Sequence, residues 1–207
     1  MNDLIATREQ LAAGRTSATG QVERALAVAQ SPACTNVFVS LDAAGARAVA
    51  TNAASKSLPL AGLPVTVKDL FDVEGQVTAA GSVVLRDAQP AHGDSVAVAR
   101  LRAAGAAIVG RTNMTEFAFS GVGVNPHFGT PVNPADTNTP RVPGGSSSGA
   151  AVSVATGAAF IGLGSDTGAR SASRPRCAAS SGSRTRSGSC HSTAPSPCRR
   201  RWTPCAQ

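Results

Sequence analysis

The composition of the chain changes abruptly at Ala169, and this change decides how much of it can fold. Residues 169–207 contain no valine, leucine, isoleucine or phenylalanine, and nine serines, eight arginines and four prolines fill them. A segment of this kind cannot bury enough apolar surface to offset the conformational entropy that folding removes. We therefore expect residues 169–207 to be a disordered tail and the folded domain to lie within residues 1–168.

Charge and cysteine follow the same division. Residues 1–168 hold 11 basic and 12 acidic residues, whereas residues 169–207 hold eight arginines and no acidic residue, so the net charge of +7 comes from the tail. Four of the five cysteines also lie there, and a near-neutral body with one cysteine is unlike a secreted disulfide scaffold. The first residues form no signal peptide, and no apolar run is long enough to span a membrane. We expect a cytoplasmic protein with no membrane partner.

Apolar periodicity in the body alternates between helical and strand-like spacing. Helices are predicted, from this spacing and from capping residues, over 2–13, 18–30 with Thr19 as N-cap, 42–55, 94–104 with Asp94 or Ser95 as N-cap and Gly105 as C-cap, and 150–157. Short apolar and β-branched runs predict buried strands over 63–67, 106–109 and 160–163. Alternating helices and buried strands are typical of an α/β fold.

Three segments carry residues that can do chemistry. Lys68 ends the strand predicted in GLPVTVKD at 62–69, the serine-bearing loop PGGSSSG occupies 143–149, and GLGSDTG occupies 162–168. Each has an ordinary explanation when taken alone. A lysine at a strand end is usually a surface residue whose ammonium reaches water, and a Gly/Ser loop before a helix is usually a turn or a generic anion site. No Gly-Lys-Ser/Thr follows the loop, so it is not a Walker loop.

In their shared order and spacing, these segments resemble the amidase-signature family, which includes bacterial amidases and the amidase subunit of the glutamyl-tRNA(Gln) amidotransferase. The resemblance runs from about residue 60 to residue 168. Further segments that support it are TAAGS at 78–82, GRTNMTEF at 110–117 and NPHFGTP at 125–131. The resemblance implies that residues 1–168 are the N-terminal part of an α/β amidase domain, with a mixed β-sheet flanked by helices.

The resemblance also implies hydrolysis of a carboxylic amide by a Ser–cis-Ser–Lys mechanism. Lys68 matches the base, and Ser146 matches a bridging serine held in a cis peptide. The residues implied to surround this pair are Gly144, Gly145 and Ser147 in the serine loop, and Asp166, Thr167 and Gly168 in a loop that binds the oxyanion and substrate. A lysine acts as a base near neutral pH only if burial lowers its pKa by several units. No metal or cofactor is implied, and the expected ligand is a small-molecule amide.

The match fails at the expected nucleophile. The family pattern continues Asp-x-Gly-Gly-Ser, which places the nucleophilic serine at position 170, but this chain has Ala169 and Arg170. A guanidinium has no nucleophilic role, so we predict that this copy is catalytically inactive. One base missing near codon 169 accounts for the break, because the alternative frame permits glycine and serine there. The single tryptophan codon of Trp202 also fixes an aspartate in a family-like Leu-Asp-Thr-Val run. Residues 169–207 are then an out-of-frame tail.

Two other functions stay open from the sequence. The first is the amidase subunit of a glutamine-dependent tRNA amidotransferase, which releases ammonia from glutamine. The second is a non-catalytic relic whose basic tail binds nucleic acid through salt-sensitive phosphate contacts. The frame hypothesis explains the abrupt break, the cysteines and the missing apolar residues together, so nucleic acid is not the partner we expect. The particular amide and the oligomeric state stay open.

Overall fold

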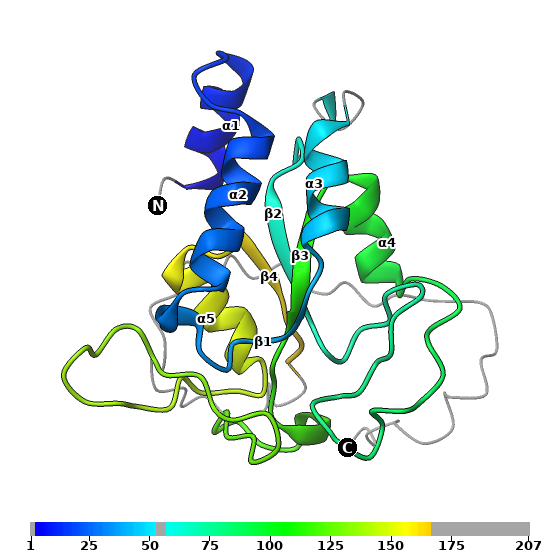
Figure 1. Ribbon diagram of the computed structural model, residues 1–207, viewed down its shortest axis with the longest axis vertical. Coiled ribbons are helices and arrows are strands. Elements are labelled where there is room, and N and C mark those ends of the chain that lie inside the picture. The colour runs from blue at the N-terminus through cyan, green and yellow to red at the C-terminus, as the bar shows by residue number, and fades with distance from the viewer. Residues whose placement is uncertain (1–2, 53–56, 167–207) are drawn as a thin grey trace, which may run out of the picture.

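A computed structural model describes residues 3–52 and 57–166, which form a four-stranded mixed sheet flanked by helices (Figure 1). The strands are β1 Phe38–Leu41, β2 Pro64–Lys68, β3 Ala107–Thr112 and β4 Ile161–Leu163. The α-helices are α1 Leu4–Ala12, α2 Ala18–Ala29, α3 Ala43–Thr51, α4 Val96–Ala103 and α5 Ser148–Thr156, and two short 3-10 helices are η1 Pro32–Cys34 and η3 Glu116–Ala118. The predicted α/β class is confirmed. The tail predicted to be disordered, 169–207, lies outside the described residues.

The order of the strands in the sheet is β1-β3-β2-β4. Strand β2 runs parallel to both β3 and β4, whereas β1 pairs antiparallel with β3 at the edge. The carboxyl ends of β2, β3 and β4 therefore lie at the same end of the sheet. Open α/β sheets bind ligands outside the carboxyl ends of their strands. Lys68 is the last residue of β2 and lies there.

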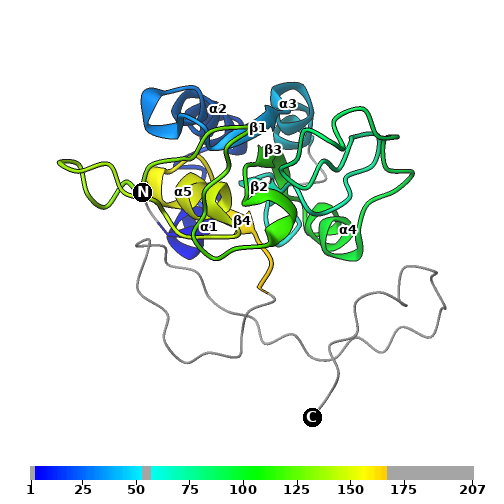
Figure 2. The same cartoon turned by 90° about the horizontal axis from the view of Figure 1, so that it is seen from below.

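Alternation along β2 assigns its side chains to two faces of the sheet. Val65 and Val67 belong to the apolar clusters that include α4, and Val67 packs in the cluster that contains Val98. Thr66 points the other way, and its Oγ1 lies 2.9 Å from Ser153 Oγ on α5. Figure 2 shows α4 and α5 on opposite sides of the central strands. Because side chains alternate along a strand, Lys68 shares the α5 face with Thr66.

Helices α2 and α3 lie side by side against the β1–β3 end of the sheet (Figure 2). Val22 and Leu26 on α2 pack with Ala46 on α3 and Val109 on β3 in one buried cluster. Full burial of a valine or leucine side chain contributes roughly 1.5–3 kcal/mol. Small alanines on α3 let this helix approach the sheet closely.

Two details at the N-terminal half differ from the prediction. Ser17 rather than Thr19 caps α2, because the Ser17 Oγ accepts the Gly20 N–H at 3.0 Å while Thr19 lies inside the first turn. The structure also contains a strand, β1, that the sequence did not predict. The strand is half-buried then exposed, and its residues FVSL, preceded by Val37, have the apolar and aromatic character typical of a strand, a signal that the prediction did not use.

Helix α4 begins after Ser95, which is one of the two predicted caps, but the Ser95 side chain makes no capping hydrogen bond. The other candidate, Asp94, instead forms an ion pair with Arg102 at 2.7 Å. Gly105 follows the helix with a φ of +83°, as the predicted C-terminal signal requires.

Strand β3 continues three residues beyond the predicted end at Val109. Gly110 lies inside the extension, and a Cβ atom there would collide with the backbone oxygen of Ser40 on β1. The glycine therefore marks a close approach of two strands rather than the end of one. Helix α5 likewise begins at Ser148, two residues earlier than predicted.

Candidate active site

Lys68 has the largest side chain among the fully buried residues, and none of its surface is exposed to solvent. Its Nζ lies 2.7 Å from Ser146 Oγ and 2.8 Å from Ser165 Oγ. These two serines come from different segments, the loop before α5 and the loop after β4. The parallel arrangement of β2 and β4 brings both segments to the carboxyl end of β2. A buried ammonium in this place is stabilised by hydroxyl groups.

The loop that carries Ser146 is fixed through its backbone. The peptide bond between Gly145 and Ser146 is cis. The Gly145 N–H donates to the Gly121 carbonyl at 2.8 Å, and the Thr115 N–H donates to the Ser146 carbonyl at 3.0 Å. A Cβ on Gly145 would lie 2.7 Å from Gly123 Cα and 2.9 Å from Thr115 Oγ1. Only glycine fits this position, and the close packing sets where the Ser146 hydroxyl points.

A second contact ties the serine loop to the segment after β4. The Ser165 N–H donates to Ser147 Oγ at 3.2 Å, and that same oxygen lies 3.3 Å from the Ser165 carbonyl. Gly164 packs directly beside this contact, since a Cβ there would lie 2.8 Å from Ser147 Oγ. Ser147 is also the residue that precedes the first turn of α5. The two hydroxyl groups that face Lys68 are therefore held relative to each other.

Burial lowers the pKa of Lys68 from 10.5 to about 8, and the nearby carboxylate of Asp166 opposes part of this change. Desolvation disfavours the charged form of a lysine, whereas an opposite charge favours it. With a pKa of about 8, roughly one molecule in ten carries a neutral Lys68 amine at pH 7. A neutral amine has a lone pair that can accept a proton, so the structure provides a candidate base.

An ion pair on the opposite face of the sheet fixes the residue after Lys68. Asp69 and Arg111 are 1% and 3% exposed, and Asp69 Oδ1 accepts from Arg111 Nε at 2.8 Å. The other Asp69 oxygen accepts the Gly81 N–H at 2.9 Å, and Arg111 also donates to the Phe71 carbonyl at 3.0 Å. These bonds hold the loop that leaves β2 against β3. They define the backbone direction at the end of the strand.

The structure brings together most of the residues that the sequence nominated. Lys68 and Ser146 are in contact, and Gly144, Gly145 and Ser147 form the loop around Ser146. Asp166 is exposed and close enough to act on the Lys68 charge. Thr167, Gly168 and Arg170 lie outside the described residues. The sequence did not single out Ser165 as a partner of Lys68. Its position in GSDTG, directly after β4, was the available signal.

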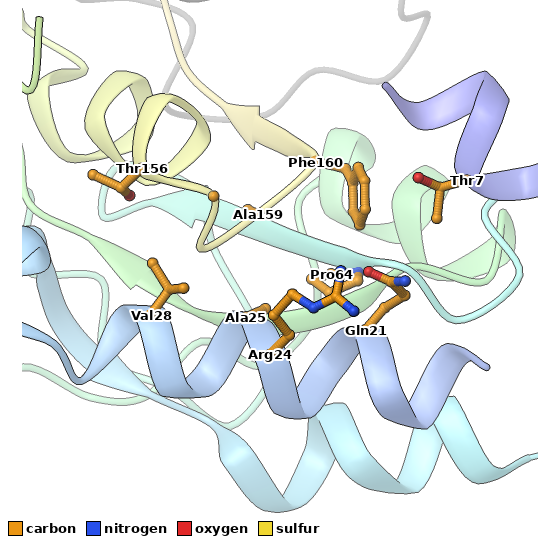
Figure 3. A pocket seen from close by; sticks show the side chains of 10 residues that line it. Thr7, Gln21, Arg24, Ala25, Val28, Pro64, Thr156, Ala159 and Phe160 are labelled. Carbon is orange, nitrogen blue, oxygen red and sulfur yellow. The ribbon is translucent and has the colours of Figure 1, made fainter. Parts of the chain in front are cut away.

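A cavity of about 260 Å³ lies at the end of the sheet opposite Lys68 (Figure 3). Its lining includes Pro64, which begins β2, Phe160, which precedes β4, and Thr156 at the end of α5. It therefore opens at the amino ends of the parallel strands, away from Lys68. Arg24 is the one charged residue among those that line it. The cavity offers no base next to a hydroxyl nucleophile, so we place the chemistry at the carboxyl ends of β2, β3 and β4.

Within residues 3–52 and 57–166, no three side chains of histidine, cysteine, aspartate or glutamate are grouped so that they could share a metal ion. Over the same residues, no helix has both the length and the apolar character that crossing a membrane requires.

Comparison with known proteins decides the family of this chain. The model of the Amidase family matches residues 21–171. The chain belongs to the amidase family. Members of this family are hydrolases that act on amides. The match includes Lys68, Ser146 and Ser165, and it ends shortly after the point at which the composition of the chain changes.

Two curated members of the amidase family show how much of a whole protein is represented. AtzE, the 1-carboxybiuret hydrolase subunit of Pseudomonas sp. (strain ADP), is 45% identical over 166 residues, which are 77% of this chain and 36% of that protein. A glutamyl-tRNA(Gln) amidotransferase subunit of Nitratidesulfovibrio vulgaris (strain DP4) is 50% identical over 129 residues, which are 62% of this chain and 24% of that protein. The chain thus spans about a third or less of the length of these relatives.

A solved structure extends the similarity to three dimensions. It is described as an unexpected vestigial protein complex that reveals the evolutionary origins of an s-triazine catabolic enzyme. The two chains superpose with a TM-score of 0.75 at 42% sequence identity. The superposition covers 80% of this chain and 37% of the other. The sheet and helices described above are therefore those of the amidase fold.

Proposed function

We propose that this chain carries the base and relay half of an amide-hydrolysing site, and that the chain itself does not turn over amides. The observation that carries the proposal is the contact of a fully buried lysine amine, Lys68 Nζ, with Ser146 Oγ at 2.7 Å. Burying an ammonium is costly for stability, and the exposed carboxylate of Asp166 offsets only part of that cost. The arrangement is better explained by a need for a neutral amine.

The chemistry follows from the two hydroxyl contacts of Lys68. In an intact counterpart, the neutral Lys68 amine takes the proton of Ser146, and Ser146 takes the proton of a nucleophilic serine. That serine, at position 170 in the family pattern, attacks the amide carbonyl. The C–N bond breaks as Ser146 passes its proton to the leaving nitrogen and takes one back from Lys68, so ammonia leaves and an acyl-enzyme forms. Water then releases the acid. Ser165 accepts a hydrogen from Lys68 Nζ and holds the amine in place.

Position 170 is the reason for proposing that this copy is inactive. An arginine side chain stays protonated at all pH values relevant here and cannot attack a carbonyl. The family match ends at residue 171, and the residues that follow contain no valine, leucine, isoleucine or phenylalanine. We attribute both features to one missing base near codon 169. Resequencing codons 165–172 from the source, together with an intact mass of the expressed chain, tests this attribution directly.

The catalytic assignment is tested in a gene with the reading frame restored by one base. Ammonium release from a panel of primary amides is expected from the restored protein. Substitution Lys68→Met removes the base, and Ser146→Ala removes the relay, so each is expected to lower kcat/KM by about 10²–10⁴-fold. Lys56→Met is the matched control, since Lys56 is the other lysine of the chain. A restored protein without amidase activity, or one that tolerates Lys68→Met, contradicts the proposal.

A second function is favoured by the relative of 50% identity, which is named as one subunit of a glutamyl-tRNA(Gln) amidotransferase. In that setting the same Lys68 and Ser146 pair serves release of ammonia from glutamine. The restored protein then hydrolyses glutamine and leaves other primary amides untouched, and its activity rises when a companion subunit is added. Hydrolysis of several unrelated amides by the restored protein alone favours the simple amidase.

A further inference from the structure

The hydroxyl of Ser146 is hydrogen-bonded to a buried amine without needing any residue beyond 166. We propose that, in the 207-residue chain as it stands, Ser146 is itself an acyl acceptor that reacts with activated acyl donors such as aryl esters, with Lys68 as its base. The inference uses the same Lys68 and Ser146 pair as the proposed function. It assigns Ser146 a different role, nucleophile rather than relay, and it does not depend on what occupies position 170.

Accessibility distinguishes the two groups. Lys68 is completely buried, whereas Ser146 is only half-buried. A reagent arriving from solvent therefore meets the Ser146 hydroxyl before it can meet the amine. A serine hydroxyl is a weak nucleophile unless a base lies within hydrogen-bond reach, about 2.6–3.2 Å. The 2.7 Å separation of Lys68 Nζ and Ser146 Oγ meets this requirement.

The second hydroxyl orients the amine. A neutral lysine amine has two N–H donors and one lone pair. Ser165 Oγ, 2.8 Å from Lys68 Nζ, accepts one of these hydrogens, which leaves the lone pair free to accept the Ser146 O–H. The backbone carbonyl of Ser146 accepts the Thr115 N–H at 3.0 Å, which fixes the backbone from which the hydroxyl reaches Lys68 Nζ.

The charged groups around Lys68 do not prevent its amine from losing a proton. Burial brings the pKa of Lys68 down to about 8, against the opposing charge of Asp166. Asp69, next in the chain, is paired with Arg111 on the other face of the sheet. Neither α5 nor β4, which flank the amine, contains a titratable side chain. The amine therefore loses its proton in an accessible pH range.

The start of α5 offers electrostatic support for the reaction. Ser146 lies two residues before the first residue of this nine-residue helix. The N-terminal end of a helix carries a partial positive charge that favours a nearby anion. The oxyanion that forms when Ser146 attacks a carbonyl develops next to that end.

Transfer of the acyl group to Ser146 needs no reactant other than the aryl ester. The Ser146 Oγ forms a bond to the acyl carbon, and the bond from that carbon to the aryl oxygen breaks. The proton of Ser146 moves to Lys68 Nζ and then to solvent. The products are acyl-Ser146 and the aryl oxide, which takes a proton from solvent only below its own pKa. An aryl oxide leaves with its electron pair unassisted, whereas an amine must be protonated as it leaves, so the proposed reaction is with esters and not with amides.

The experiment treats the folded 207-residue chain, in a Lys56→Met background, with p-nitrophenyl acetate. The background leaves Lys68 as the one lysine. Peptide mapping separates acetylation of Ser146 from acetylation of the N-terminal amine, and the rate at which Ser146 gains an acetyl group is expected to rise with pH around a midpoint near 8. Adding Lys68→Met should slow the labelling of Ser146 by about 10²-fold or more. Ser146→Ala should abolish it, while Ser31→Ala, at the turn that follows α2, should leave it unchanged.

Several results would overturn the proposal. They are an acetyl group on Lys68 instead of Ser146, equal labelling of Ser146 in the folded chain and in urea, and no labelling of Ser146 in a chain that circular dichroism shows to be folded. The pH profile of acetylation at Ser146, read peptide by peptide, needs no variant at the site, so it decides the question even if Lys68→Met fails to fold. The proposed amidase function is tested separately in the frame-restored protein. Either inference can therefore fail without the other.

Discussion

The pKa of Lys68 can be measured directly, because the chain contains only two lysines. Substitution Lys56→Met leaves one lysine, and labelling it with ¹³C at Cε gives one NMR signal whose shift follows its charge. We expect this signal to titrate with a midpoint of about 8 rather than 10.5. At pH 8, about half of the Lys68 side chains are then neutral, compared with fewer than about one in a hundred for an ordinary lysine.

The magnitude follows from the burial of the amine. A pKa lowered from 10.5 to about 8 corresponds to roughly 3 kcal/mol of differential interaction between the two protonation states. Water that reaches the amine beside the half-buried Ser146 would reduce this value, so it is an upper estimate. Between about pH 8 and 10.5 the unfolded chain binds more protons than the native chain at Lys68. This group therefore makes the native state more stable as pH rises through that window, and urea unfolding across it measures the change.

A titration midpoint of Lys68 at or above about 10, the ordinary value for a lysine, would refute the reasoning. In that case the amine would be solvated despite its complete burial, and it could not serve as a base near neutral pH. Titration in urea is the control, since unfolding removes the desolvation and the midpoint should return to the ordinary lysine value of about 10.4.

Three further substitutions test the surroundings of the pair. Asp166→Asn removes a charge that raises the pKa of Lys68, so the same NMR titration should move to lower pH, and an unchanged or higher midpoint contradicts this assignment. Asp69→Asn leaves the buried Arg111 without its carboxylate and should lower the free energy of unfolding by about 3–5 kcal/mol in urea titrations, whereas a loss below about 1 kcal/mol would mean that the pair is solvated. Gly145→Ala places a Cβ 2.7 Å from a neighbouring backbone atom, so acetylation of Ser146 by the aryl ester should fall, and labelling at the original rate would show that the loop tolerates the displacement.

The elements with strong apolar periodicity were the ones the sequence predicted well. Helix α2 has Val22, Leu26 and Ala29 on one buried face, and β2 is buried at every residue, so each leaves a clear pattern. The predicted ends of helices and strands were less accurate, because these ends depend on single hydrogen bonds and on neighbouring strands. Ser17 caps α2 because its side-chain oxygen accepts the Gly20 N–H. The spacing of residues in the sequence does not show whether Ser17 or Thr19 makes this bond.

Strand β1 illustrates that a local apolar run, here VFV at 37–39, does not reveal which distant strand it pairs with. It exists because Phe38 pairs with Thr112, a residue more than seventy positions later, and its own residues are only half-buried or exposed. The site shows the same limit. Lys68 and Ser146 are 78 positions apart and were nominated by resemblance, whereas the role of Ser165 depends on β4 lying beside β2. Contacts of this range follow from the sheet order, which the local pattern does not specify.

The central claim is that this chain holds a base and a relay hydroxyl but no third group that can attack an amide. The most direct measurement is ammonium release from simple primary amides by the purified, folded 207-residue chain. We predict no release above the rate without protein. Sustained turnover of an amide that stops when Lys68 is changed to methionine would contradict the claim, because an attacking oxygen would then be present in the chain.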